Sequence, residues 1–177
     1  MHTRSDAPEL PVACVPAAVR RILAALAAAG HPSVLVGGCV RDLLQGRPVH
    51  DFDVATPAPP EVVLERFARA VPIGLRHGTV MIPTEAGPVD VTTFRAAPGA
   101  APASSADEAL SRDLGLRDFT VNALAFRLDP PELIDRHGGL SDLAADRLRA
   151  VGSAEARLAE DPLRALRAAR LLAERGL

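Results

Sequence analysis

One strand–glycine–helix–strand segment constrains the fold of this chain more than any other stretch. It begins with an apolar run at 33–36 (SVLV), which predicts a short buried strand. Gly37 and Gly38 end that strand, and residues 39–45 (CVRDLLQ) predict a short helix. A second strand is predicted at 51–55 (DFDVA). The chain therefore has to return to a sheet directly after a tight glycine turn and one short helix.

The rest of the chain alternates between helical and extended patterns. Helices are predicted at 16–29, 58–70, 107–114, 138–148 and 160–176, and strands at 71–74, 78–83 and 89–95. Residues 116–126 predict a short helix that runs into a strand, and residues 132–134 look extended. The mixed pattern becomes wholly helical near 150–158, which is where we expect a domain boundary.

Composition excludes several classes of protein. Hydrophobic residues make up 48% of the chain and aromatic residues only 3%, so the core has to consist of Ala, Val, Leu and Ile. The net charge of −2 argues against a broad basic surface that binds nucleic acid nonspecifically. Cys14 and Cys39 have no CxxC spacing, so we expect neither a disulfide framework nor a zinc site, and a reducing cytoplasm fits. No apolar run reaches membrane-spanning length, so we expect no membrane partner.

Asp51 and Asp53 are the first candidate site residues. Successive side chains of a strand point to opposite faces, so these two carboxylates share a face, with Cα atoms roughly 6–7 Å apart. Two such carboxylates can bind one hard cation, and Mg²⁺ ions held in this way can bind the attacking and leaving oxygens of a phosphoryl transfer. The alternative is a strand end that carries two solvated acids.

The glycine pair upstream favours the metal interpretation. Gly37 and Gly38 lie between a strand and a helix start, where free backbone N–H groups can bind an anion. Arg41 falls in the first turn of that helix, near any phosphate held there. The alternative is a tight turn that simply needs glycine. The pattern is neither GxGxxG nor a P-loop, since the chain contains no Lys.

Asp90 could add a third carboxylate. In the predicted strand VDVTTFR, Asp90 shares one face with Thr92 and Phe94. On a strand beside the aspartate pair, Asp90 would complete a metal triad and help to deprotonate an attacking hydroxyl. The alternative is an acid on an edge strand.

Four sequence blocks in a fixed order resemble a known family and together cover roughly residues 33–172. They are LVGGCVRDLLQGRPVHDFDVAT (35–56), RDFTVNALAF (117–126), IDRHGGLSDL (134–143) and EDPLRALRAAR (160–170). They are similar to the motifs of the class II tRNA nucleotidyltransferase and bacterial poly(A) polymerase family, within the polymerase β-like superfamily.

The resemblance implies a fold and a reaction. Together with the strand count it predicts an α+β head at 1–152, with a mixed, mostly antiparallel sheet of about five strands flanked by helices. Residues 153–177 would start a helical neck. The implied reaction adds C, or C and A, to tRNA 3′ ends, from CTP and, for A, ATP. The RNA 3′-hydroxyl attacks the nucleotide α-phosphate and pyrophosphate leaves, with Mg²⁺ as cofactor.

The resemblance also implies residue roles. Asp51 and Asp53 would bind magnesium, and Asp161 and Arg164 would present hydrogen-bonding groups to the base of the incoming nucleotide. The residues implied to bind nucleotide are Gly37, Gly38, Arg41, Arg117, Asn122, Asp161, Arg164, Arg167 and Arg170.

The spacing of the last four of these residues is compatible with that role. They recur every three residues and would form one slowly drifting stripe on a helix. An Asp supplies acceptors and an Arg a fork of donors, which can match the Watson–Crick edge of cytosine. The alternative is a solvated stripe with one ion pair.

The chain departs from the family pattern in three places. Leu116 stands where the family usually has the first Arg of Arg-Arg-Asp, so one contact could be weaker. The loop 96–106 lacks the Arg and aromatic residues that the family uses in switching from CTP to ATP, which hints at a CC-adding enzyme. The helical body and tail that grip tRNA in the family have no counterpart here. The alternatives are a poly(A) polymerase, disfavoured by GLRHGTVMI (74–82), and a nucleotide-binding fragment inactive on RNA.

Overall fold

The computed structural model describes residue 10 and residues 12–74 and 77–175. The strands are β1 Val34–Val36, β2 Phe52–Thr56, β3 Val71–Gly74, β4 Thr79–Thr84, β5 Gly87–Thr93, β6 Leu124–Leu128 and β7 Pro131–Asp135. The helices are α1 Ala17–Ala28, α2 Gly38–Leu44, α3 Pro60–Arg66, α4 Ala106–Gly115, α5 Gly139–Ala144, α6 Ala154–Glu160 and α7 Leu163–Arg175, with 3-10 turns η1 Val12–Cys14 and η3 Thr120–Asn122.

The described strands form one sheet in the order β3-β4-β5-β2-β1-β6-β7. All neighbouring pairs are antiparallel except β2 with β5, which run parallel. The predicted α+β class and mostly antiparallel sheet are therefore confirmed. The prediction of about five strands was too low, because β6 and β7 pair in an antiparallel hairpin and extend the sheet beyond β1 to seven strands.

Alternating side chains divide the core into two layers on the two faces of the sheet. Leu35 of β1 packs in the cluster that includes Ile22 and Leu26 of α1. Its neighbours Val34 and Val36 pack instead with Leu110 and Leu114 of α4 and with other residues on the opposite face. The period-two pattern of a strand thus explains why β1 is apolar at every position, since both of its faces are covered.

Prolines and turn geometry shorten three of the predicted helices, those at 58–70, 138–148 and 160–176. Pro59 has extended backbone angles and Pro60 occupies the first turn of α3, so this helix begins at 60 instead of 58. It ends at Arg66 because Phe67 is extended. Helix α5 ends at Ala144, and Asp146 follows it with a positive φ of 47°. The break between α6 and α7 falls at Asp161-Pro162, where the chain leaves the helical conformation.

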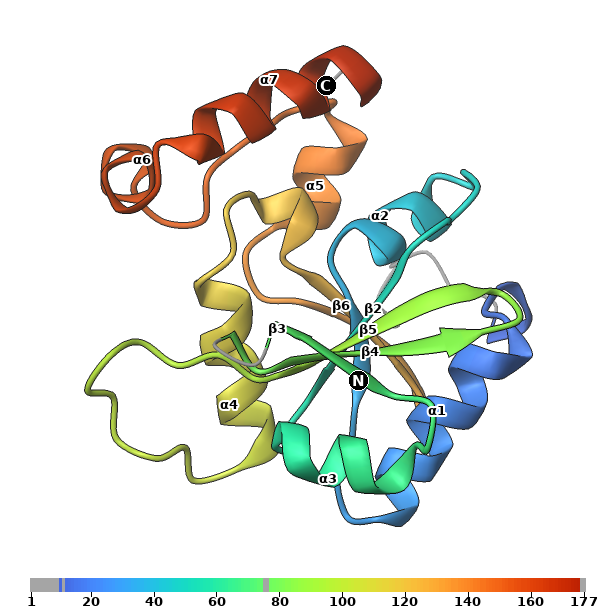
Figure 1. The fold of residues 1–177 in the computed structure, drawn as a ribbon. Coiled ribbons are helices and arrows are strands. Elements are labelled where there is room, and N and C mark those ends of the chain that lie inside the picture. Colours follow the sequence, from blue (N-terminus) through green and yellow to red (C-terminus); the bar gives the residue numbers. More distant parts are fainter. Residues whose placement is uncertain (1–9, 11, 75–76, 176–177) are drawn as a thin grey trace, which may run out of the picture.

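Helices α5, α6 and α7 lie together at one end of the molecule, on the side where α2 is also found (Figure 1). A small third apolar cluster connects α7 with η3 and α5. In it, Phe119, Val121 and Leu143 pack with Leu171 of α7. This arrangement places the C-terminal helix opposite the glycine turn between β1 and α2.

Candidate functional site

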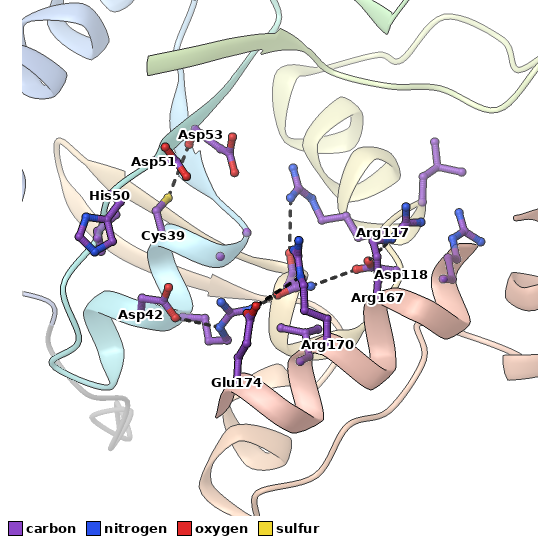
Figure 2. A pocket seen from close by; sticks show the side chains of 18 of the residues that line it. Cys39, Asp42, His50, Asp51, Asp53, Arg117, Asp118, Arg167, Arg170 and Glu174 are labelled. Atoms are coloured by element: carbon purple, nitrogen blue, oxygen red, sulfur yellow. Dashed lines mark hydrogen bonds and ion pairs between the residues drawn. The ribbon is translucent and has the colours of Figure 1, made fainter. Parts of the chain in front are cut away.

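A polar cavity of about 550 Å³ lies between the glycine turn, the start of β2, the segment around η3 and one face of α7. Nearly all of the residues predicted as a site from the sequence line it. These are Gly37, Gly38, Arg41, Asp51, Asp53, Arg117, Asn122, Arg164, Arg167 and Arg170. Asp90 and Asp161 do not. In Figure 2, Asp51 and Asp53 lie side by side on one wall, and Arg117, Arg167 and Arg170 lie across from them.

Gly37 allows the side chain of Arg117 to approach the glycine turn closely. Its φ of 78° and ψ of −138° define a conformation that is essentially restricted to glycine. A Cβ atom at this position would lie 2.8 Å from Nη1 of Arg117 and 3.8 Å from Oδ2 of Asp53. The space left by the missing side chain is therefore filled by a guanidinium that faces a carboxylate.

Arg41 connects α2 to η3. Its buried guanidinium donates from Nε to Oδ1 of Asp42 at 3.0 Å, and from Nη1 to Oδ1 of Asn122. Asn122 in turn donates from Nδ2 to Asp118 at 3.2 Å. These bonds order one wall of the cavity, and they place Asn122 and Arg41, which the sequence separates widely, in direct contact.

The carboxylates crowd at the parallel pair β2–β5. Asp53 and Asp90 are directly opposite in register, and Asp51 lies just before β2, which begins one residue later than predicted. Burial raises the pKa of the Asp53 carboxyl to about 6, an effect that the charges of Asp90 and Asp51 reinforce and those of Arg117 and Arg95 oppose. Burial also raises the pKa of Asp90, as does the negative charge of Asp51. Such crowded carboxylates favour a bound cation.

The donor set suits magnesium only in part. Within the described part of the chain, no three His, Cys, Asp or Glu side chains gather closely enough to hold one ion. Asp51 and Asp53 both line the cavity, whereas Asp90 stays outside the lining. Two carboxylate ligands fit an ion whose other ligands are phosphate oxygens and water, as is usual for Mg²⁺. Cys39 also lines the cavity, but burial raises the pKa of its thiol to about 12, so it is not a thiolate nucleophile.

Helix α7 supplies the opposite wall. Arg167 lies 3.2 Å from Asp118 and 2.7 Å from Asp161, whereas Arg164 donates to Glu160 at 2.6 Å. Among the described residues, Asp161 therefore pairs with Arg167 and not with Arg164, so the ion pair of the alternative interpretation does not form at this spacing. Asp161 instead accepts the backbone N–H of Leu163 at 2.9 Å, because it precedes α7 and its carboxylate satisfies a free donor of the first turn.

Several residues that line the cavity have no role predicted from the sequence. Among them are Arg95, just beyond β5, Asp118, which follows Arg117, and Glu174, near the end of α7. The RDFT block contained a signal for Asp118, because it is part of the same motif as Arg117. Nothing in the strand pattern around Arg95 indicated that its side chain would reach the cavity.

None of the helices in the described residues combines the length and apolar character needed to cross a bilayer.

Comparison with known proteins adds a family and several relatives. The sequence model described as "Poly A polymerase head domain" matches residues 33–149. The CCA-adding enzyme of Latilactobacillus sakei subsp. sakei (strain 23K) is 45% identical over 160 residues, which are 88% of this chain and 40% of that protein. The CC-adding tRNA nucleotidyltransferase of Shouchella clausii (strain KSM-K16) is 45% identical over 151 residues, 85% of this chain and 37% of that protein.

Solved structures agree with these relatives. The Bacillus stearothermophilus CCA-adding enzyme in complex with CTP is 39% identical with a TM-score of 0.81, and the match covers 90% of this chain and 39% of that one. A tRNA nucleotidyltransferase complexed with a primer tRNA and an incoming ATP analog is 31% identical with a TM-score of 0.71, covering 85% and 44%. The chain thus spans about 40% of the length of the curated relatives it matches.

Proposed function

Because this chain belongs to the family of the poly(A) polymerase head domain, we propose that it is the catalytic head of a tRNA nucleotidyltransferase that adds C, or C and A, to tRNA 3′ ends. The observation that carries the proposal is the shared cavity. It combines the paired carboxylates Asp51 and Asp53 with arginines from α7, which is the combination that a metal–nucleotide complex needs. We assign residues 1–152 to the head and 153–177 to the start of a helical neck.

Asp51 and Asp53 would hold magnesium, which supplies Lewis-acid stabilisation of the phosphoryl oxygens when it is bound. The 3′-hydroxyl of the RNA then attacks the α-phosphate of the nucleotide, and pyrophosphate leaves. Asp90 lies opposite Asp53 in register but outside the cavity lining, so we propose that its negative charge acts on the Asp53 carboxylate. Its predicted part in deprotonating the attacking 3′-hydroxyl stays a prediction. Arg117 lines the same cavity as Asp53, and its positive charge would neutralise negative charge on the triphosphate.

We assign recognition of the base to α7 and to Asp161, which precedes it. Arg164, Arg167 and Arg170 reach the cavity. Asp161 engages Arg167, so it would have to exchange this partner in order to present its acceptors to a base together with Arg164. We propose that this exchange of partners allows Arg164, Arg167 and Arg170 of α7 to select between nucleotides.

We propose CTP as the first nucleotide and C as the first residue added. The loop from Ala96 to Ser105 contains no Arg and no aromatic residue, and its end is tied to α4, where Arg112 donates to the carbonyl of Ala101 and Ser104 donates to Glu108. A CC-adding relative at 45% identity supports this preference. A tRNA-processing activity fits a cytoplasmic location, which we propose together with it.

The experiment that tests the function uses this chain with Mg²⁺ and a tRNA that ends before CCA. Labelled CTP and ATP are supplied in separate tubes, and the assay is repeated with a tRNA that ends in CC. We expect CTP incorporation into the first substrate and a loss of more than about 100-fold in Asp51→Asn, since a charge-stabilising ligand is removed. Glu65→Gln, on the exposed side of α3, is the matched charge control.

Each alternative predicts its own result. Incorporation of ATP alone, without CTP, would identify a poly(A)-type activity. Magnesium-dependent CTP binding with no incorporation into either tRNA would identify a nucleotide site that needs a separate RNA-holding part. Undiminished addition by Asp51→Asn would rule out the metal assignment.

A further inference from the structure

A buried carboxylate outside the cavity holds two of the cavity's arginines. Asp113 lies on the inner face of α4 between Leu110 and Leu114, and it is only 1% exposed. Its Oδ1 accepts from Nε of Arg95 at 2.7 Å and from the backbone N–H of Arg95 at 3.1 Å. Its Oδ2 accepts from Arg117, from Nη2 at 3.1 Å and from Nε at 3.3 Å.

The two arginines reach the cavity although their common partner does not. Arg95 and Arg117 both line it, and Asp113 is absent from the lining. The side chain of Arg95 is 41% exposed and that of Arg117 is 16% exposed, whereas that of Asp113 is 2% exposed. One carboxylate therefore anchors two guanidiniums that line the cavity, and Arg117 is held further by the carbonyl oxygen of Asn122, to which its Nη1 donates at 3.4 Å.

Without this anchor the arginines would have other partners nearby. Nη1 of Arg117 and Oδ2 of Asp53 both lie within 4 Å of the position that a Cβ atom of Gly37 would take. A free guanidinium in that position would pair with the Asp53 carboxylate and compete with a bound cation. Asp113 offers both arginines charged hydrogen bonds inside the protein: Arg95 donates to both of its oxygens, and Arg117 donates twice to Oδ2. These bonds are stronger than an exposed pair, because a buried charged hydrogen bond is less screened.

We propose that Asp113 is a positioning residue that orients Arg95 and Arg117 toward the triphosphate of the incoming nucleotide. Arg95 is thereby assigned to the phosphate-binding wall, a role that the sequence motifs did not indicate. The proposal rests on the proposed function, since it names the part of the nucleotide that these arginines contact. Asp113 itself touches no nucleotide.

The test separates a phosphate-specific effect from a general loss of structure. CTP, CMP and cytidine are titrated into the chain in the presence of Mg²⁺, with wild type and Asp113→Asn compared by calorimetry. We expect the affinity for CTP to fall at least about tenfold, since hydrogen bonds to charged groups are lost, while cytidine affinity changes little. Asp107→Asn, which removes an exposed carboxylate from the same helix, should leave all three affinities unchanged.

A second variant keeps the proposal testable if Asp113→Asn folds poorly. Arg95→Gln leaves Asp113 paired with Arg117 and should weaken CTP more than CMP. The thermal midpoint should fall as well, because the buried Asp113 carboxylate loses the hydrogen bond from Nε of Arg95. The double variant with Arg95→Gln and Arg117→Gln is then compared with the triple variant that also carries Asp113→Asn. The third change should cause no further loss of CTP affinity.

The outcomes are distinct. If Asp113→Asn weakens cytidine and CTP equally, or if its loss adds to that of the two arginine variants, the positioning role is wrong and the proposed function stands. If the wild-type chain binds no CTP, the proposed function fails, and the assignment of these arginines to a triphosphate fails with it.

Discussion

At the scale of single residues, Gly37 is where backbone conformation and the site depend on each other most directly. We predict that Gly37→Ala loses roughly 1–3 kcal/mol of unfolding free energy, because its backbone angles are costly for any side chain. We also predict weaker CTP binding, because the new Cβ would displace Arg117, whose Nη1 lies 2.8 Å from that position. Urea unfolding and CTP titration measure the two effects.

Gly30 offers a matched control. Its φ of 84° is similar, but a Cβ there would have nothing within 4 Å. Gly30→Ala should therefore lose stability through backbone strain alone and bind CTP like the wild type. Equal CTP affinity in both folded variants would show that the close approach of Arg117 to the glycine turn does not matter for binding.

Asp113 also leads to a prediction about pH. Its burial alone would raise the pKa of the carboxyl, but the hydrogen bond from Arg95 and the positive charges of Arg117 and Arg95 outweigh burial and lower it. A group with a lowered folded-state pKa stabilises the protein above its unfolded pKa of about 3.9 and loses that stabilisation as the pH falls through the folded value.

The wild type should therefore exceed Asp113→Asn in unfolding free energy by the largest margin at neutral pH. The margin should shrink as the pH is lowered below about 4. Urea unfolding of both proteins across this range gives the comparison. A margin that stays constant down to the acid limit would mean that the ionised form of Asp113 is not what its arginine partners stabilise.

Sequence motifs predicted most of the residues that line the cavity. They did not predict which of these side chains pair with each other. The spacing of Asp161 and Arg164 predicted a shared stripe on one helix, but spacing cannot show that Asp161 precedes α7 and accepts a backbone N–H of its first turn. Arg95 was not predicted at all, because its position depends on Asp113, and a contact between distant segments leaves no local pattern.

At the scale of elements, the fit of α5 against η3 depends on one small residue. A Cβ at Gly139 would lie 2.3 Å from the carbonyl oxygen of Thr120 and 3.0 Å from Cδ2 of Leu124. We predict that Gly139→Ala costs about 1–3 kcal/mol of unfolding free energy or more, since it overpacks a backbone contact that cannot easily move. Thermal and urea unfolding test it.

Gly115 is the comparison for that variant. It is the last residue of α4, and the nearest atom to a Cβ there is Nε2 of His137 at 3.9 Å. Gly115→Ala should be neutral or stabilise the chain by up to about 1 kcal/mol, because Ala favours helix over Gly. A similar loss in both variants would place the effect of Gly139→Ala in the helix backbone and not in its contact with η3.

The elements also show the limits of local patterns. Most helices and strands were predicted near their observed positions, because apolar periodicity reports which face is buried. Membership of the sheet was harder. The segment 132–134 looked extended, but only its pairing with β6 makes it a seventh strand, and that pairing depends on tertiary contacts.

At the scale of the whole molecule, the apolar core and the cavity are built from different parts of the chain. The two large apolar clusters contain only residues before 152. The cavity, in contrast, is completed by Arg164, Arg167 and Arg170. Helix α7 joins the head through Leu171, whereas Leu163 and Leu166 on the same helix are 60% and 68% exposed. Stability should therefore depend mainly on the head, and nucleotide binding on both parts.

Removal of residues 153–177 separates these two properties. We predict that the shortened chain keeps its sheet, seen as a cooperative unfolding transition by circular dichroism, with a lower midpoint because Phe119 and Val121 lose the cover of Leu171. CTP affinity should fall by about 100-fold or more, since three charged contacts are removed together.

A full-length variant with Arg164, Arg167 and Arg170 each changed to Gln distinguishes lost charge from lost packing. It keeps Leu171 in place but loses the ion pairs of Arg164 and Arg167, so its unfolding midpoint should fall less than that of the shortened chain. Its CTP affinity should fall as far as in the shortened chain. If the shortened chain fails to fold, residues 1–152 are not an independent head and the proposed boundary is wrong. If the Gln variant binds CTP normally, α7 only packs against the head, and its three arginines are not part of the nucleotide site.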